Sequence, residues 1–223
     1  MSSGSPKHAL LQQFALVART MGHPDRLEIL EQLGQGECSV DALARRSKLT
    51  VATTSQHLQN MRRAGLVTAR RDGKFVLYRI SDDSVILAVA AIRMVAEKNL
   101  AEVDRIIAGY FAERDSMEPV SREELLARTR EGSVSVIDVR PPEEYAVAHL
   151  PGAVNIPLAE LEHRLNDFDP TTDIVAYCRG PWCVLSFEAV AALRKHGFAA
   201  RRLADGLPEW RAAGFPVKAS SLG

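Results

Sequence analysis

The residues best suited to chemistry are two cysteines at the ends of a short loop. Residues 173–183 form an apolar, strand-like run that ends on Cys178, continue through a loop to Cys183, and lead into a helical pattern. A loop over the start of a helix directs several backbone N–H groups inward, which stabilises an anion and lowers a thiol pKa. Arg179 adds a positive charge beside the thiol. The pattern predicts a reactive thiolate at Cys178, with Arg179 and Cys183 as its catalytic neighbours.

Gly180, Pro181 and Trp182 complete this loop, and Pro181 limits how far it can relax. Cys183 has two interpretations. It is either a second thiol that attacks sulfur held on Cys178, or a small residue at a helix start. In the first case the two thiols could close a disulfide or bind a soft ion such as As(III). For Cys178 the alternative is a buried strand-end cysteine, and we favour the reactive interpretation because ligands of α/β sheets bind beyond strand ends.

The elements around the cysteines alternate between strand and helix. Strand patterns cover residues 134–139, 154–156 and 174–177, and helical patterns lie between and after them. This alternation predicts a small α/β domain with a parallel sheet. Asp138 and Arg140 lie at the end of the first strand, near the loop, and we expect them to form a buried ion pair that supports it rather than to react directly.

The first half of the chain has a different pattern, mainly of short helices. The fourth helical pattern places Thr54, Leu58 and Met61 on one face and ends at Gly65. Two alternating runs follow, residues 66–70 and 74–80, on either side of a turn that contains Asp-Gly, which is typical of a tight hairpin. Two helices joined by a tight turn and followed by a hairpin predict a winged helix-turn-helix.

The charge distribution agrees with a nucleic-acid partner for this half. The whole chain has no net charge, with 28 basic and 28 acidic residues, but residues 45–79 hold nine basic residues and the single acid Asp72. We expect this surface to bind double-stranded operator DNA rather than to be merely solvated. The predicted contact residues are Thr53, Ser55, Gln56, Gln59, Arg62 and Arg63 on the helix and Arg70, Arg71 and Lys74 on the hairpin. His57 on the same helix is assigned neither to DNA nor to the core.

A long helical pattern then runs from residue 81 to about residue 111, and residues 85–92 are apolar at every position. A helix that is apolar all round must be buried all round, so we expect a second subunit to cover it, giving a homodimer with a palindromic operator. Residues 114–119 lack periodicity and are interpreted as a linker. The predicted domains are therefore residues 1–115 and 116–223.

Composition excludes several classes of protein. With 46% hydrophobic and 25% charged residues and no apolar run of about 18 residues, the chain does not resemble a membrane protein. Its first residues show no secretory signal, so we expect a cytoplasmic protein whose three cysteines start out reduced. No cofactor and no metal are expected.

The second half, about residues 119–218, resembles a single rhodanese domain. The matching segments are residues 136–140, 143–145, 148–153, 155–157 and 206–210. The resemblance implies that Cys178 accepts a sulfane sulfur as a persulfide and passes it to a thiol acceptor. The implied donor is a persulfide, a polysulfide or thiosulfate, although many active members hold thiosulfate with further basic loop residues and Arg179 is the only one here. Related cysteine phosphatases carry an arginine where this chain has Val184, which argues against phosphatase activity. The resemblance places His149 in a structural turn rather than in catalysis.

The first half, about residues 8–112, resembles the ArsR/SmtB family of dimeric winged-helix repressors. The matching segments are residues 23–30, 54–67 and 78–80. Metal-sensing members carry a Cys-x-Cys in the third helix, where this chain has only Cys38, so that metal site is not expected. Sulfide-sensing members pair a cysteine in this region with one on the last helix, and residues 81–117 contain no cysteine. We interpret Cys38 as a packing residue.

Together these patterns predict a dimeric, repressor-like DNA-binding regulator whose rhodanese domain accepts or transfers sulfane sulfur through Cys178. Two alternatives stay open. One is a sulfurtransferase whose winged helix serves mainly for dimerisation. The other is a regulator whose rhodanese domain is catalytically inactive and only senses a ligand.

Overall fold

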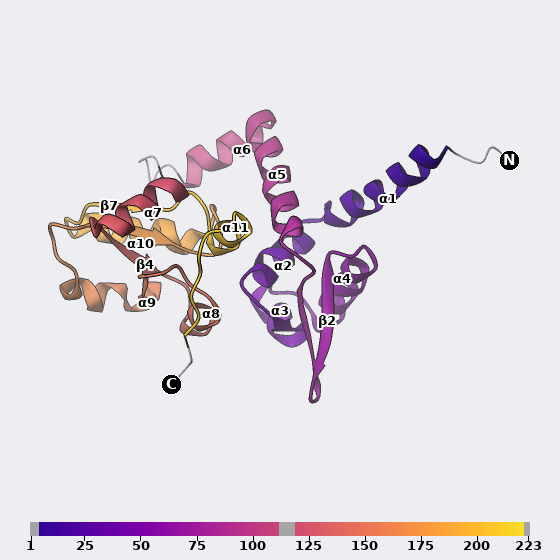
Figure 1. Ribbon diagram of the computed structural model, residues 1–223, viewed down its shortest axis with the longest axis horizontal. Coiled ribbons are helices and arrows are strands. Elements are labelled where there is room, and N and C mark those ends of the chain that lie inside the picture. Colours follow the sequence, from indigo (N-terminus) through magenta and orange to yellow (C-terminus); the bar gives the residue numbers. More distant parts are fainter. Residues whose placement is uncertain (1–4, 112–118, 221–223) are drawn as a thin grey trace. The chain divides into compact units, whose positions relative to one another are not determined.

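The computed structural model describes residues 5–111 and 119–220, and these divide into two compact units, the first ending at Val89 and the second beginning at Ala90 (Figure 1). The predicted domain boundary at residue 115, and the predicted linker except Pro119, lie outside the described residues. Among the described residues, no helix is long and apolar enough to cross a membrane.

The four helices predicted in the first unit are present. They are α1 (Pro6–Met21), α2 (Pro24–Gly34), α3 (Val40–Arg46) and α4 (Val51–Arg63). Each begins at a side chain that accepts a backbone N–H of the first turn, the favourable arrangement for a helix start; these residues are Ser5, His23, Ser39 and Thr50. The turn between α3 and α4 contains Lys48, whose φ of 53° is the single positive value among the described non-glycine residues.

The core of the first unit follows the predicted helical spacing. Thr54, Leu58 and Met61 on α4 are fully buried, as their shared face requires. The hairpin strands are β2 (Val67–Asp72) and β3 (Phe75–Ile80), and the turn lies at Gly73 and Lys74, one residue later than the sequence pattern suggests, because Asp72 pairs with Phe75. A further short strand, β1 (Cys38–Ser39), pairs with β3 to give the sheet order β1-β3-β2.

The long helix expected over residues 81–111 is interrupted. It consists of α5 (Ser84–Asn99), α6 (Ala101–Ile106) and a π-helical turn, Ile107–Phe111. The break falls at Leu100, whose extended backbone has φ −112° and ψ 104°, and the side-chain amide of Asn99 donates to the Val95 carbonyl at the end of α5. The prediction of one continuous helix is therefore wrong, because Asn99 and Leu100 end the first segment.

The second unit contains a four-stranded parallel sheet with the order β5-β4-β6-β7. Its strands are β4 (Val134–Asp138), β5 (Val154–Asn155), β6 (Asp173–Tyr177) and β7 (Ala200–Arg202). The sequence patterns predict the first three but not β7, because that strand has three residues and two of them are arginines. Helices accompany the sheet: α7 (Arg122–Glu131), α8 (Pro142–Val147), α9 (Leu158–Leu161), a 3-10 turn (Glu162–Asp167), α10 (Val184–Lys195) and α11 (Leu207–Ala212).

Both faces of this sheet are buried, and successive strand residues alternate between them. On β6, Val175 and Tyr177 pack with α7 and α11, whereas Ile174 and Ala176 pack with α9 and α10. Cys178 continues this alternation and belongs to the cluster on the α10 side. The strand therefore delivers the cysteine to the carboxyl edge of the sheet, facing the helix that follows the loop.

Candidate thiol site and DNA-binding face

The sulfur atoms of Cys178 and Cys183 meet in the second unit. Their Cα atoms lie 6.1 Å apart and the two residues are paired as a disulfide. This separation is within the range that a disulfide spans without backbone movement. Cys178 is 1% exposed, and Cys183, just before α10, is half-buried. The arrangement can cycle between a dithiol and a disulfide.

Backbone hydrogen bonds close the loop between the two cysteines. The Cys183 N–H donates to the Gly180 carbonyl over 3.2 Å, and the Cys183 carbonyl accepts from the backbone and hydroxyl of Ser186. The carbonyl of Pro181 accepts from the buried guanidinium of Arg202 on β7 at 3.1 Å. The loop is therefore held by a neighbouring strand as well as by α10.

Arg179 does not stand as an isolated positive charge beside the thiol. Its guanidinium pairs with the carboxylate of Glu144 on α8, with Nη2 2.7 Å from Oε1. The Glu144 side chain is only 3% exposed, so the pair is largely removed from water. Sequence patterns do not single out Glu144 as a site residue, although it lies in a segment that carries the rhodanese resemblance.

The Trp182 side chain contacts the part of α5 that belongs to the second unit. Its indole N–H donates to the Glu97 carboxylate at 2.7 Å, and its ring lies 5.0 Å from that of Phe111. Arg93, one turn before Glu97, pairs with Glu209 of α11 at 3.0 Å. Two side chains of α5 thus contact the loop and the helix that follows β7.

The backbone of Gly206 lies directly against the loop. A Cβ atom at this position would overlap the peptide between Arg179 and Gly180. The Leu207 N–H, next along the chain, donates to the Cys178 carbonyl at 3.3 Å. Gly206 therefore allows the segment before α11 to lie directly against the loop.

Asp138 and Arg140 form the expected buried ion pair, with both side chains fully buried and 2.5 Å between Nη2 and Oδ2. Arg140 also donates to the Ala148 carbonyl, and the Tyr177 hydroxyl joins the pair by donating to Asp138. Burial and then the Asp138 charge raise the pKa of Tyr177 well above its ordinary value. Burial alone would lower the pKa of Arg140, but Asp138 raises it. Tyr177 directly precedes Cys178, so this network fixes the end of the strand that carries the thiol.

His149 is buried in a turn, stacked on Tyr145 with ring centres 3.8 Å apart. Its Nδ1 lies 2.9 Å from the Tyr145 carbonyl, and its backbone pairs with Lys218. These contacts hold the turn and account for the ring through Tyr145.

The predicted DNA-contact residues of α4 lie opposite its buried face. Thr53, Gln56, Gln59, Arg62 and Arg63 are exposed, and Ser55 is half-buried. Gln59, Arg62 and Arg63 line a surface depression together with Tyr78 of β3. The helix therefore presents amide and guanidinium groups on one outward face.

The wing carries the other three predicted DNA contacts, and Arg70 differs from Arg71 and Lys74 because it is paired with acidic side chains. Arg71 and Lys74 are exposed at the hairpin end. Arg70 pairs with Glu37, with Nη2 2.7 Å from Oε2, and lies 3.3 Å from Asp72. The hydrogen bond from Arg70 lowers the pKa of Glu37, so part of the Arg70 charge is already compensated. Cys38, beside Glu37, is a buried cysteine on β1 that takes no part in the disulfide.

Comparisons with known proteins cover both units. Residues 23–69 match the family described as bacterial regulatory protein, arsR family, and residues 121–213 match the rhodanese-like domain. The HTH-type transcriptional regulator Rv0324 of Mycobacterium tuberculosis is 43% identical over 211 residues, 95% of this chain and 92% of its own length.

Two further relatives match parts of the chain. The putative sulfur carrier protein YrkF of Bacillus subtilis is 39% identical over 66 residues, 30% of this chain and 35% of its own length. The homodimeric winged helix-turn-helix DNA-binding domain of Mb0332 from Mycobacterium bovis is 37% identical, with a TM-score of 0.41 over 45% of this chain and 93% of that one. Because the match to the Mycobacterium tuberculosis regulator extends over both units, the chain belongs to the arsR family of bacterial regulatory proteins, as a member that carries a C-terminal rhodanese-like domain.

Proposed function

We propose that the protein is a homodimeric DNA-binding regulator in which Cys178 receives sulfane sulfur and reports its presence to the DNA-binding unit. The observation that carries this proposal is the meeting of Cys178 and Cys183 at the carboxyl edge of the sheet, on a chain that also holds a basic winged helix. The name of the relative YrkF, a putative sulfur carrier protein, agrees with the sulfur chemistry.

The first step is sulfur transfer from a persulfide or polysulfide donor. The Cys178 thiolate attacks the terminal sulfur of a donor R–S–SH, a new S–S bond forms at Cys178, and the donor leaves as the thiolate RS⁻. The product is a persulfide on Cys178. Cys178 is 1% exposed in the disulfide form, so the proposal requires that the dithiol form admits the donor to this sulfur.

The second step uses the neighbouring thiol. The Cys183 thiolate attacks the inner sulfur of the Cys178 persulfide, the outer sulfur leaves with its own hydrogen as HS⁻, and the disulfide remains. The persulfide is the oxidant in this step, so no further electron acceptor is needed. The disulfide described here is then the product of the cycle, and an external thiol returns it to the dithiol.

The DNA-binding unit acts through α4 and the wing. Arg62 and Arg63 lie on the exposed face of α4, and Arg71 and Lys74 lie at the hairpin end, an arrangement suited to a major groove and its flanking phosphates. Dimerisation is supported by exposed apolar side chains in the first unit, such as Phe14 on α1 (63% exposed) and Leu87 on α5 (52% exposed).

We propose that coupling runs along the chain through α5. Trp182 of the cysteine loop donates to Glu97 of α5, and this helix begins at Ser84, next to the end of the wing. A change at Cys178 or Cys183 that moves Trp182 alters the contacts of α5. Coupling requires that the dithiol, persulfide and disulfide forms favour different DNA-binding states, because a modification without differential affinity shifts nothing.

Intact-protein mass spectrometry after polysulfide treatment tests the sulfur chemistry. The Cys183→Ser variant retains the persulfide and gains the mass of one sulfur atom, since the attacking thiol is gone. Wild type proceeds to the disulfide and loses two hydrogens. Cys178→Ser shows neither change, and Cys38→Ser serves as the control that behaves like wild type. Full sulfur loading of Cys178→Ser would overturn the assignment.

Fluorescence anisotropy with the DNA upstream of the coding region tests the regulator assignment. Gln56→Ala and Arg63→Ala each weaken binding by about tenfold, since a base contact contributes about 1–3 kcal/mol. Arg130→Ala removes one exposed positive charge from α7 and leaves affinity unchanged. Binding without sequence preference, or binding equal to wild type in both α4 variants, would refute the assignment.

The second candidate function is a regulator whose rhodanese-like domain binds or senses without turnover. The pairing of Arg179 with buried Glu144 favours it over thiosulfate chemistry, because the loop's one arginine is already neutralised. Steady-state transfer from thiosulfate to cyanide distinguishes the two: turnover that requires Cys178 supports an enzyme, whereas stoichiometric loading without turnover supports a sensor.

A further inference from the structure

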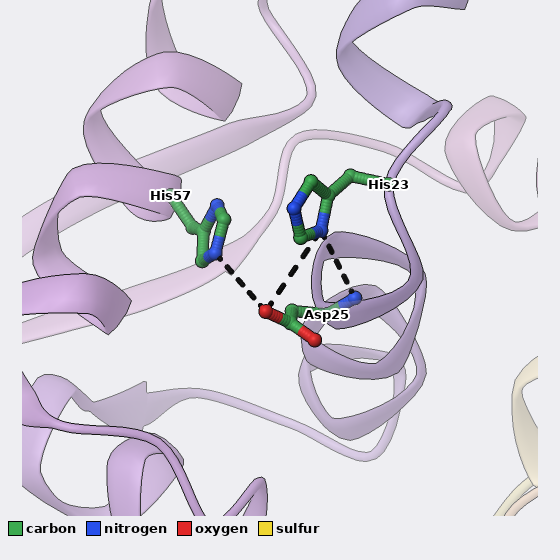
Figure 2. Close-up of side chains that lie close together, drawn as sticks. All are labelled: His23, Asp25 and His57. Carbon is green, nitrogen blue, oxygen red and sulfur yellow. Dashed lines mark hydrogen bonds and ion pairs between the residues drawn. The ribbon is translucent and has the colours of Figure 1, made fainter.

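Three side chains with metal-binding atoms meet in the first unit, far from Cys178 and Cys183 in sequence. His23 is the N-cap of α2, Asp25 lies in the first turn of that helix, and His57 lies in the middle of α4. Figure 2 shows the two imidazole rings and the carboxylate directed toward one another. One ligand atom from each lies within 4.8 Å of the other two.

The distances suit a small cation. The His57 Nε2 atom lies 3.4 Å from Asp25 Oδ2, and the His23 Nδ1 atom lies 3.9 Å from the same oxygen. Two ligands of one tetrahedral zinc ion are about 3.4 Å apart when each metal–ligand bond is about 2.0–2.1 Å. The His57–Asp25 pair already has this separation, and a small rotation of the exposed His23 ring brings the third ligand to it.

The chemical identity of the ligands selects the class of ion. Two imidazole nitrogens and one carboxylate oxygen suit Zn²⁺, Co²⁺ or Ni²⁺, and they do not suit Ca²⁺, which takes oxygen ligands, or a thiophilic ion such as As(III). The His57 side chain is 12% exposed, whereas His23 and Asp25 are 40% and 35% exposed. An ion can therefore enter from solvent while one ligand stays anchored in the fold.

Two features of the surroundings oppose binding and limit its strength. The His23 Nδ1 atom accepts the Asp25 backbone N–H at 3.2 Å, and ligation by Nδ1 replaces this cap. The helix start is also a positive end of the α2 dipole, and Arg26 lies next to Asp25. The Asp25 carboxylate supplies the compensating charge.

We propose that His23, Asp25 and His57 form a binding site for one first-row transition-metal ion of the zinc class per chain, open to solvent at the remaining position. The site is separate from the Cys-x-Cys position at which only Cys38 is present. It joins the start of α2 to α4, so the ion fixes α4 in the unit. Its effect on DNA affinity rests on the proposed function, whereas ion binding does not.

Titration of the full-length, tag-free protein with Zn²⁺ tests the site. The background is Cys178→Ser/Cys183→Ser, which removes the two thiols of the cysteine loop and leaves only the buried Cys38. Calorimetry gives stoichiometry and affinity. One ion binds per chain, and Asp25→Asn and His57→Gln each weaken binding by at least about tenfold. His8→Gln, an exposed histidine on α1, is the matched control and binds as the parent does.

Asp25→Asn separates a metal site from an ordinary hydrogen bond, because asparagine keeps an oxygen that accepts from His57 but lacks the carboxylate charge. Circular dichroism of each variant establishes that it folds. Co²⁺ in place of Zn²⁺ gives a second readout, a visible spectrum without thiolate charge-transfer bands. Absence of a Zn²⁺ isotherm in the folded parent, or equal affinity in parent, Asp25→Asn and His57→Gln, would overturn the proposal and leave the cluster as a structural contact. If the parent protein binds Zn²⁺ but does not bind operator DNA, the proposed function is refuted and the metal site is not.

Discussion

At the residue scale, the second unit depends on charges that the fold has removed from water. Asp138 and Arg140 are both fully buried and satisfy each other, with the Ala148 carbonyl as a further acceptor. Buried ion pairs of this kind contribute little net stability, but removing one partner leaves an uncompensated charge. The strand end that carries the thiol is therefore destabilised when either partner of this ion pair is removed.

Asp138→Asn tests this dependence. The variant leaves the Arg140 charge buried without its counter-ion and should lose about 3–5 kcal/mol of unfolding free energy, measured by urea denaturation followed at the tryptophans. The matched control is Glu102→Gln, which breaks the exposed pair with Arg105 and should change stability by less than about 1 kcal/mol. Equal effects of the two substitutions would contradict the buried role.

Tyr177 should make the free energy of unfolding fall at alkaline pH. Its pKa is raised well above the ordinary value, by burial and then by the Asp138 charge. The folded protein therefore keeps the proton at pH values where the unfolded chain releases it. The contribution to stability is complete below about pH 10, the ordinary tyrosine pKa, and is lost as pH rises above it.

Urea denaturation at pH 9 and pH 11 should show a larger loss of stability in wild type than in Tyr177→Phe, which has no hydroxyl to ionise. The same loss in both proteins would show that Tyr177 ionises equally in the folded and unfolded chains.

At the element scale, the cysteine loop is shaped by what packs against it rather than by its own residues alone. β6 sets the position of Cys178, α10 begins directly after Cys183, and Gly206 brings the segment before α11 against the Arg179–Gly180 peptide. Because these elements come from separate parts of the chain, the loop geometry is a tertiary property.

Gly206→Ala should displace the loop, since the added Cβ overlaps the Arg179–Gly180 peptide. Both thiols remain, so the expected result is slower persulfide formation and disulfide closure, by about tenfold or more, followed by mass spectrometry after polysulfide treatment. Gly109→Ala is the control, because a Cβ there meets nothing within 4 Å. Wild-type rates for Gly206→Ala would show that the close approach does not shape the site.

The sequence predicts features that depend on local spacing and composition, and it does not predict features that depend on packing between distant segments. The spacing of Thr54, Leu58 and Met61 predicts one buried helical face, and the apolar composition of the β6 segment predicts a strand. The structure confirms both predictions. β7 is not predictable from its three residues, and the contact of Arg179 with Glu144 depends on packing between β6 and α8. The meeting of His57 with Asp25 likewise follows from how two helices pack, which no local pattern encodes.

At the scale of the whole molecule, exposed apolar faces in the first unit predict the assembly. Phe14 on α1 and Leu87 on α5 are more than half exposed. Phe14→Asp or Leu87→Asp should convert the dimer to monomer in light scattering after size exclusion, because a buried carboxylate has no partner. Val154→Asp, at a position of β5 that is 50% exposed, should stay dimeric. A dimer that survives both first-unit substitutions would place the interface elsewhere.

The proposed function requires that sulfur bound at Cys178 changes the affinity of α4 for DNA. Its most direct test is the operator affinity of the dithiol protein before and after polysulfide treatment, measured on the same samples for wild type and Cys178→Ser. Operator affinity should change by at least about fivefold in wild type, the smaller end of allosteric coupling, and should not change in Cys178→Ser. Unchanged affinity of wild-type protein whose Cys178 has taken up sulfur would contradict it, and would leave two activities on one chain without communication.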